Sequence, residues 1–294
     1  MSAAVALVSA RAAHASDEDL PPLLAAFGRA GARAEVADWD DPAIEWGRFD
    51  IALLRSTWDY TGRLGEFLAW VQRTAEATML LNAPAVVRWN CDKHYLGELA
   101  AAGAPVVASV FAEPGAGAAA VLDAFLSQHA CSEFVVKPAV GAGSRDTRRH
   151  ARSAHAEARG HIAQLLDGER AVLLQPYLSA VDAHGETALI YIGGRFSHAI
   201  RKGALLPPRA EATRALFAPE EITPRTPDAD ELAAAERVLA AAPFAALPYA
   251  RIDLIRDDTQ APRLLELELI EPSLFFAHAP GAAARLAATV LAQR

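Results

Sequence analysis

Short apolar runs alternate with helix-like segments over the first eighty residues, and this alternation constrains the fold more than any other feature of the sequence. The apolar runs cover residues 5–8, 34–36, 50–54 and 79–81. Between them, the Ser-Asp-Glu-Asp sequence of residues 16–19 is typical of the first turn of a helix, and apolar side chains recur with helical spacing over residues 64–71. We therefore expect a parallel sheet covered by helices, whose ligands bind beyond the carboxyl ends of the strands.

The remainder of the chain predicts an α+β arrangement. A helix is expected to begin near residues 90–92 and to end at Gly103, with Lys93 in its first turn and a strand over residues 105–107 after it. Further strands are predicted over residues 134–136, 172–174, 187–192, 195–200, 251–255 and 264–269, and helices over residues 155–166, 230–242 and after Pro280. Residues 202–227 show no periodicity, which is typical of a lid or a substrate loop.

Composition limits the class of protein. The chain has 294 residues, of which 52% are hydrophobic and 22% charged, so it can bury a large core in two or three subdomains. Its net charge of −8 argues against a broad surface for nucleic acid or an anionic membrane. The two cysteines have no metal-like spacing, and no apolar run is long enough for a membrane span. We expect a cytoplasmic protein with reduced thiols.

Two lysines and a glycine-rich loop indicate a site for phosphate groups. Lys93 follows an Asn-Cys-Asp sequence, and Lys137 ends a β-rich run that leads into Gly141, Gly143 and Ser144. Lysines supply point charges for phosphate oxygens, and glycines let backbone N–H groups approach closely. The loop matches neither a Walker A motif nor a dinucleotide fingerprint, and a Gly-x-Gly sequence alone is more often structural.

An acidic strand near the C-terminus indicates a metal site. Glu266 and Glu268 are two positions apart on a predicted strand, so their side chains share one face, and Asp253 on the preceding strand could join them. A solvated strand face is the alternative. No lysine nearby balances these carboxylates, however, and neighbouring carboxylates repel each other. A bound Mg²⁺ ion would relieve that repulsion, because it prefers oxygen ligands.

A polar and aromatic loop follows the strand that ends at residue 54. Its sequence is Arg55-Ser56-Thr57-Trp58-Asp59-Tyr60. The two aromatic side chains could belong to the core, but the polar residues around them favour a loop that faces the substrate. Its place beyond the carboxyl end of a strand supports the same prediction.

In the order and spacing of these motifs, the chain resembles the ATP-grasp superfamily of carboxylate–amine ligases over nearly its whole length. The resemblance implies an N-terminal α/β domain over residues 1–88 and two α+β subdomains over 89–177 and 178–294 that sandwich ATP. It assigns the nucleotide contacts to Lys93, Lys137, Gly141, Gly143, Ser144, Gln175, Pro176, Tyr177, Leu178 and Glu186.

The resemblance also assigns the catalytic and metal-binding residues. Arg201 would face the transferred phosphoryl group, and Arg251 would lie on the strand that closes the active site. Asp253, Glu266 and Glu268 match the usual ligands of Mg²⁺, for which Mn²⁺ is an alternative. The chain departs from the family at one position, because the last of these ligands is commonly asparagine.

Such ligases phosphorylate a carboxylate to an acyl phosphate, which a nucleophile then attacks, releasing ADP and phosphate. Residues 55–60 and 89–93 resemble a small group of these ligases that cyclise O-ureido-D-serine in the biosynthesis of the antibiotic D-cycloserine. This implies a small amino-acid-like substrate and an intramolecular nucleophile. Two alternatives stay open: a ligase that joins an amino acid or peptide to a separate amine, and a non-catalytic nucleotide-binding module. A homo-oligomer is equally left open.

Overall fold

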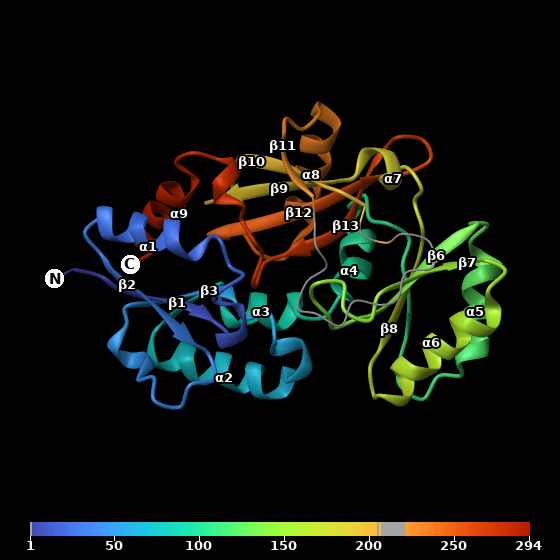
Figure 1. Ribbon diagram of the computed structural model, residues 1–294, viewed down its shortest axis with the longest axis horizontal. Coiled ribbons are helices and arrows are strands. Elements are labelled where there is room, and N and C mark those ends of the chain that lie inside the picture. The colour runs from blue at the N-terminus through green and yellow to red at the C-terminus, as the bar shows by residue number, and fades with distance from the viewer. Residues whose placement is uncertain (1, 205, 207–220) are drawn as a thin grey trace.

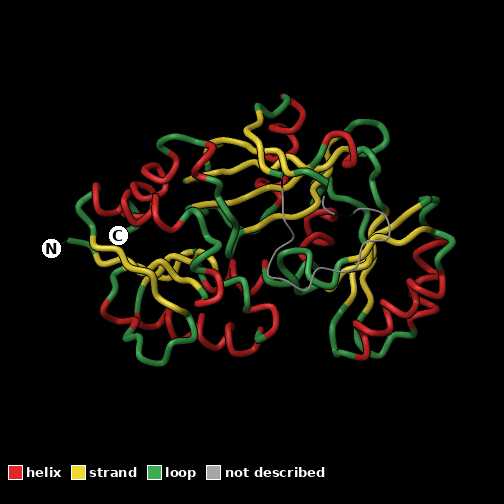
Figure 2. Tube along the Cα trace, in the orientation of Figure 1, coloured by secondary structure: helices red, strands yellow, loops and turns green. Residues whose placement is uncertain are grey.

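The structure of the protein is a computed structural model that describes residues 2–204, 206 and 221–294. It contains three β-sheets with helices packed on them (Figures 1 and 2). The N-terminal sheet is parallel and the other two are antiparallel, which confirms the expected fold class. No helix in this described part of the chain has the length and apolar character that a membrane span requires.

The N-terminal sheet is buried on both faces. Its strands lie in the order β2, β1, β3, β4, where β1 is Ala4–Ser9, β2 is Arg33–Asp38, β3 is Ile51–Ser56 and β4 is Met79–Leu81. Side chains alternate along a strand, so Val5 and Leu7 pack with α1 (Leu20–Arg29), whereas Ala6 and Val8 pack with α2 (Leu64–Ala77). The predicted alternation of strands and helices is confirmed here.

A second sheet lies at the right of Figure 1, with its strands in the order β5, β8, β6, β7. Its strands are β5 (Val110–Ala112), β6 (Glu133–Pro138), β7 (Arg148–Ala151) and β8 (Val172–Pro176). Helices α5 (Ala118–Gln128) and α6 (His155–Asp167) cover it, and Phe125, Ile162, Phe134 and Val136 share one apolar cluster. The strands predicted over 134–136 and 172–174, and the helix between them, are confirmed.

The largest sheet runs along the top of Figure 1 in the order β11, β10, β9, β12, β13. Its strands are β9 (Glu186–Ile192), β10 (Arg195–Lys202), β11 (Ile222–Arg225), β12 (Tyr249–Arg256) and β13 (Pro262–Glu268), and the short helix α7 (Val181–His184) precedes them. Leu189 packs with α8 (Ala229–Ala241) and Ile190 packs with α9 (Ala282–Leu291), so the sheet is covered on both faces.

The strands predicted over residues 187–192 and 195–200 are confirmed, and they form an antiparallel hairpin. Gly193 and Gly194 join β9 and β10 with φ angles of +58° and +74°, which glycine adopts without a steric penalty. The expected lack of regular structure over 202–227 is wrong for residues 222–225, which pair with β10 as an edge strand. Pro224 obscures this strand because proline is rare in strands away from an edge. Most of the predicted lid lies outside the described residues.

Two expectations for residues 90–107 are also wrong. No helix begins near residues 90–92, because α3 (Pro84–Asn90) ends there and α4 (Tyr95–Ala101) begins later, leaving Lys93 in the connection. The Asn90 side chain caps no helix, since its amide donates to the Leu267 carbonyl at 2.8 Å and accepts the Leu269 N–H at 2.8 Å. Residues 105–107 form an isolated bridge between Val106 and Leu264 in place of a strand.

Residues 271–276, which we call the C-terminal segment, return from the large sheet to the N-terminal sheet. The buried carboxylate of Asp19 accepts the N–H groups of Leu274, Phe275 and Phe276 at 2.5, 3.1 and 2.9 Å. Arg55, which is 1% exposed, donates to the Pro272 carbonyl at 2.7 Å. The two ends of the chain therefore pack together in the fold. The predicted domain boundaries after residues 88 and 177 stay a prediction.

Replacing Asp19 by Ala should lower the free energy of unfolding by about 3 kcal/mol, because three backbone N–H groups lose a charged acceptor. Urea denaturation of the full chain would measure this. Glu18→Ala is the matched control, since Glu18 is the exposed neighbour and its removal should change stability by less than about 0.5 kcal/mol. Equal losses in the two variants would contradict the role given to Asp19.

Candidate active site

A cavity of about 750 Å³ is lined by residues from the two antiparallel sheets and from loops at the edge of the parallel one. Most of the predicted site residues line it: Trp58, Tyr60, Lys93, Lys137, Gly141, Gly143, Ser144, Gln175, Pro176, Tyr177, Leu178, Glu186, Arg251, Glu266 and Glu268. The other predicted residues, Arg55, Ser56, Thr57, Asp59, Arg201 and Asp253, are not among its lining residues.

Lys93 joins the glycine-rich loop to the large sheet. Its ammonium group donates to the Gly141 carbonyl at 2.6 Å and lies 3.0 Å from an oxygen of Glu266. Its backbone N–H donates to the Ala139 carbonyl at 2.9 Å. The connection between α3 and α4 therefore places a cation at the point where the loop meets β13.

Lys137 is a buried cation without an ion pair. It ends β6 with 8% of its surface exposed, and within the described residues no carboxylate pairs with its ammonium group. The pKa of this ammonium falls from 10.5 to about 8, because burial and the nearby Lys93 lower it more than Glu266 and Glu186 raise it. An anionic ligand in the cavity would supply the missing counter-charge.

The glycine-rich loop is held in a left-handed conformation. Gly143, Ser144 and Asp146 have φ angles of +61°, +57° and +56°, and non-glycine residues adopt such angles at a cost. Arg170 donates to the Asp146 carboxylate at 2.7 Å, and Nε2 of the buried His161 lies 3.1 Å from the Asp146 carbonyl. The loop is therefore braced from behind while its glycines line the cavity.

Residues 175–178 form another wall of the cavity, where the resemblance places contacts to the nucleotide. The Gln175 amide is buried and donates to the Ser109 hydroxyl at 2.9 Å. The guanidinium of Arg149 lies 3.6 Å from the centre of the Tyr177 ring. Both side chains thus have protein partners, which fixes the edge that they present to the cavity.

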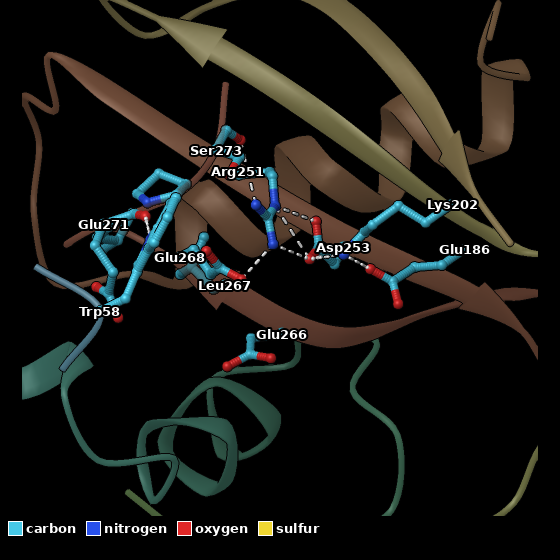
Figure 3. A network of polar contacts seen from close by, with 12 residues as sticks. Trp58, Glu186, Lys202, Arg251, Asp253, Glu266, Leu267, Glu268, Glu271 and Ser273 are labelled. Carbon is cyan, nitrogen blue, oxygen red and sulfur yellow. Dashed lines mark hydrogen bonds and ion pairs between the residues drawn. The ribbon is translucent and has the colours of Figure 1, made fainter. Parts of the chain in front are cut away.

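A buried network of opposite charges follows the large sheet (Figure 3). The Arg251 guanidinium donates to both oxygens of Asp253, at 2.9 Å from Nε and 2.9 Å from Nη2, and also contacts Glu268. The Lys202 ammonium lies 2.8 Å from the same Asp253 carboxylate and pairs with Glu186. Two cations therefore share three carboxylates along one line of the sheet.

The carboxylates of this wall fall into two groups: nearby cations lower the pKa values of the first, and burial raises those of the second. Burial alone would raise the pKa of Asp253, but Arg251 and Lys202 outweigh it and hold that pKa well below its usual range. Lys93 and Lys137 likewise keep the pKa of Glu266 low against the effect of burial. Burial raises the pKa of Glu186 to about 8, although Lys202 opposes the rise.

Glu268 belongs to the second group. Burial raises its pKa to about 7, because Asp253 and Glu266 add to the effect and Arg251 offsets only part of it. The wall therefore carries more carboxylates than its cations can stabilise. A further cation at Glu266 and Glu268 would be favourable, and their oxygens are the donors that Mg²⁺ prefers.

Glu266 and Glu268 supply oxygen ligands of the kind that a metal ion needs, but the described residues do not assemble a full set of ligands around them. The register of β12 and β13 pairs Asp253 with Glu266 and Arg251 with Glu268. Within residues 2–204, 206 and 221–294, however, no three His, Cys, Asp or Glu side chains converge as a metal-binding group. Glu266 and Glu268 fit a hard cation, provided that they share their oxygens with Lys93 and Arg251.

Arg201 does not face the cavity. Its guanidinium donates to the carbonyls of His184 at 2.6 Å and Ala183 at 3.1 Å. Lys202, the next residue along β10, lines the cavity instead, since successive side chains of a strand point to opposite faces. Lys202 was not predicted as a site residue, and the alternation of side chains along the strand that carries Arg201 was the signal that could have identified it.

The 55–60 loop is mainly structural, in contrast to the expectation that it faces the substrate. Ser56 is buried with its hydroxyl 2.7 Å from that of Ser9, and Thr57 is buried as well. Asp59 accepts the indole N–H of Trp39 at 2.9 Å. Ser56 and Asp59 make hydrogen bonds within the N-terminal domain, which explains why polar residues occur next to its apolar core.

Trp58 and Tyr60 are core aromatics that also line the cavity. They are 6% and 3% exposed, and the Tyr60 ring stacks on Phe67 at 4.7 Å between centres. The Trp58 indole donates to the Glu271 carbonyl at 2.9 Å, and the Tyr60 hydroxyl lies beside the Glu271 carboxyl group. The two alternatives considered for these side chains are therefore not exclusive.

Glu271 is a cavity residue to which the sequence analysis gave no role. It is 8% exposed, and burial together with Glu268 raises its pKa to about 8, although Tyr60 and Lys93 lower it. It follows the acidic strand in the sequence Leu-Ile-Glu-Pro, beyond the end of β13 at Glu268. The available signal was a third acid in the same motif, without a nearby lysine.

Comparison with known proteins agrees with this geometry. Residues 5–82 match the family described as the N-terminal domain of D-cycloserine synthetase DcsG. The chain is 40% identical to the cycloserine biosynthesis protein DcsG of Streptomyces lavendulae over 301 residues, which cover 99% of this chain and 98% of that protein.

Solved structures give the same result. A crystal structure of D-cycloserine synthetase DcsG superimposes with a TM-score of 0.94 at 38% identity, covering 99% of both chains. The D-alanine–D-alanine ligase of Bacillus anthracis complexed with ATP gives a TM-score of 0.71 at 13% identity, covering 99% of this chain and 96% of that one, which shows a common fold. The chain therefore belongs to the D-cycloserine synthetase family, and it is an ATP-grasp carboxylate–amine ligase.

Proposed function

We propose that this ligase uses ATP and Mg²⁺ to activate the carboxylate of a small amino acid, and that it cyclises O-ureido-D-serine to form the ring of D-cycloserine. The observation that carries the proposal is the convergence of the buried Lys137, the Lys93–Glu266 pair and the Arg251–Glu268 pair on one cavity. The 40% identity to DcsG supports the choice of substrate.

The chain's own cations would orient the nucleotide. Lys137 has no ion pair in the part of the chain that the structure describes and would bind phosphate oxygens, and the loop over residues 141–144 would cover them with backbone N–H groups. Lys202 replaces Arg201 as the cation on β10 that reaches the phosphoryl group. Glu266 and Glu268 would hold Mg²⁺, which supplies charge neutralisation at the transferred phosphoryl group when bound.

Arg251 would bind the substrate carboxylate beside the nucleotide. It already bridges carboxylates of β12 and β13, so an incoming carboxylate can compete for the guanidinium that contacts Glu268. Attack of the substrate carboxylate on the γ-phosphorus of ATP gives an acyl phosphate and ADP, and the ureido nitrogen that is bonded to oxygen then displaces phosphate and closes the ring. Hydrolysis of the carbamoyl group left on that nitrogen releases it as CO₂ and ammonia and gives D-cycloserine. Effective molarities for such ring closures reach roughly 10⁵–10⁸ M, so no second amine site is required.

With O-ureido-D-serine as the only carboxylate, we expect Mg²⁺-dependent release of ADP and a cyclic product. A coupled ADP assay followed by mass spectrometry would measure both. Adding candidate amines should not raise the rate, because the nucleophile belongs to the substrate. A protein that gave no ring product but joined another carboxylate to a separate amine would refute the cyclisation and leave the ligase class intact.

Lys202→Met should lower kcat/KM about 100-fold, because a preorganised cation near the transferring phosphoryl group is lost. Arg201→Met is the matched control on the same strand, and it should change kcat/KM by less than about 3-fold. Lys202→Arg should recover part of the activity, and thermal unfolding would show whether each variant is folded. If Arg201→Met proved the more damaging, the role implied by the family resemblance would hold instead.

Lys137→Met should raise the free energy of unfolding of the ligand-free protein at pH 7 by on the order of 2 kcal/mol, since an unpaired buried charge is removed. It should also abolish the stabilisation that Mg²⁺ and ATP give to the wild type. Thermal unfolding with and without nucleotide would measure both effects. A variant less stable than the wild type would show that the Lys137 ammonium is not an uncompensated charge.

The same residue gives a signed pH dependence. The folded state holds the proton of Lys137 with a pKa of about 8, against 10.5 for an exposed lysine. The unfolded chain therefore binds more protons between pH 8 and pH 10.5, and this residue makes the wild type gain stability as the pH rises through that range. Lys137→Met should lack this increment in urea denaturation at pH 8 and pH 10.

A further inference from the structure

Glu271 differs from the other acids that line the inner wall of the cavity. Glu186, Glu266 and Glu268 each have an ion pair with a lysine or arginine. Glu271 has none among the described residues, although it is buried to the same extent as Glu186. Its carboxyl group lies beside the Tyr60 hydroxyl, and the residue lines the cavity. A buried carboxylate in this state is best stabilised by a cation from a ligand.

The position of Glu271 is fixed by side chains from the other end of the chain. The Trp58 indole donates to the Glu271 carbonyl at 2.9 Å, and Arg55 donates to the carbonyl of Pro272 at 2.7 Å. The Asp19 carboxylate accepts backbone N–H groups of the C-terminal segment beyond them. Ordering of this kind preorganises a carboxylate and lowers the entropy that ligand binding would otherwise cost.

Glu271 also lies at the end of the charge network that contains Glu268. Figure 3 shows Lys202 and Glu186 on one side of Arg251, and Glu268, Glu271 and Trp58 on the other. Glu268 is the charged group with the largest effect on Glu271. In an α-amino acid the ammonium and the carboxylate are attached to the same carbon. If the carboxylate binds at Arg251, the ammonium must therefore bind close to it.

We propose that Glu271, oriented by Tyr60, binds the α-ammonium group of the substrate and thereby selects amino acids over carboxylic acids that lack it. This assignment rests on the proposed function, because it takes Arg251 as the site of the reacting carboxylate. Trp58 and Arg55 are positioning residues in this account. It also explains why a loop rich in polar residues is buried beside the cavity.

Asp17 is the rival acceptor. It lines the cavity with 5% of its surface exposed, and one of its carboxylate oxygens has no partner among the described residues, while the other accepts the Asp19 N–H at 2.9 Å. The Asp17 carboxylate contacts neither Arg251 nor Glu268, so it is the weaker candidate for a group that must lie beside them. Asp17→Asn is therefore the matched comparison for Glu271→Gln.

The test removes the protein carboxylate and the substrate ammonium separately and together, and compares the effects on catalysis. The kcat/KM for ADP release is measured with O-ureido-D-serine and with 3-(ureidooxy)propanoic acid, which lacks the ammonium group. The wild type should prefer the amino acid at least about 30-fold, the size expected for losing one partner of a buried charge pair. In Glu271→Gln this preference should fall below about 3-fold, with the KM for ATP unchanged.

Tyr60→Phe keeps the ring that stacks on Phe67 and removes only the hydroxyl, so it should give an intermediate preference. Asp17→Asn should keep the wild-type preference. The proposal is overturned if the preference survives in Glu271→Gln, or if it collapses in Asp17→Asn alone. Thermal unfolding of each variant confirms that the comparison is between folded proteins.

Failure of the proposed substrate is distinguishable from failure of this assignment. A wild type that turns over no O-ureido-D-serine refutes the substrate. The same cycle is then carried out by calorimetry in the presence of Mg²⁺ and a non-hydrolysable ATP analogue, with D-alanine and propanoic acid as the pair. Equal affinities of the wild type for these two ligands, or an unchanged preference in Glu271→Gln, would overturn the role of Glu271.

Discussion

The buried guanidinium of Arg251 is the interaction on which the rest of the site depends. The register of β12 and β13 places Asp253 opposite Glu266, with Glu268 two positions along the same strand. Three carboxylates so close in a low dielectric would repel each other and draw protons. Arg251 donates to Asp253 and Glu268, and Lys202 approaches Asp253 from β10, so the acids stay beside one another without unfolding the sheet.

A second constraint comes from the N-terminal sheet, which braces the cavity. Arg55 and the Pro272 carbonyl are 217 positions apart in the sequence, and their hydrogen bond is buried. Together with Trp58 and Asp19, it fixes the C-terminal segment against the parallel sheet. The end of the cavity that carries Glu271 is therefore complete only when both ends of the chain have folded. Polar side chains at the carboxyl end of β3 thus organise the site from beneath its surface.

Periodicity predicted the fold well because it reflects burial, which is local to each strand and helix. The alternation of Val5 and Leu7 with Ala6 and Val8 reports two buried faces directly. Side-chain direction and long-range partners carry no such signal. Asn90 reads as a helix cap, but it bonds β13, a contact between residues far apart in the chain. Arg201 and Lys202 are neighbours on β10, and their side chains point to opposite faces of the sheet. An assignment that is wrong by one residue therefore selects a side chain on the wrong face.

The charges of the cavity imply that its folding and its ligand binding are linked. Lys137 is buried and has no ion pair among the described residues, and burial raises the pKa values of Glu186, Glu268 and Glu271 more than the nearby cations lower them. Each group costs stability in the ligand-free protein. A nucleotide with its divalent cation would bring anionic oxygens to Lys137 and positive charge to Glu268, and an amino acid would bring an ammonium to Glu271. The same departures from ideal pairing that weaken the fold therefore define which ligands strengthen it.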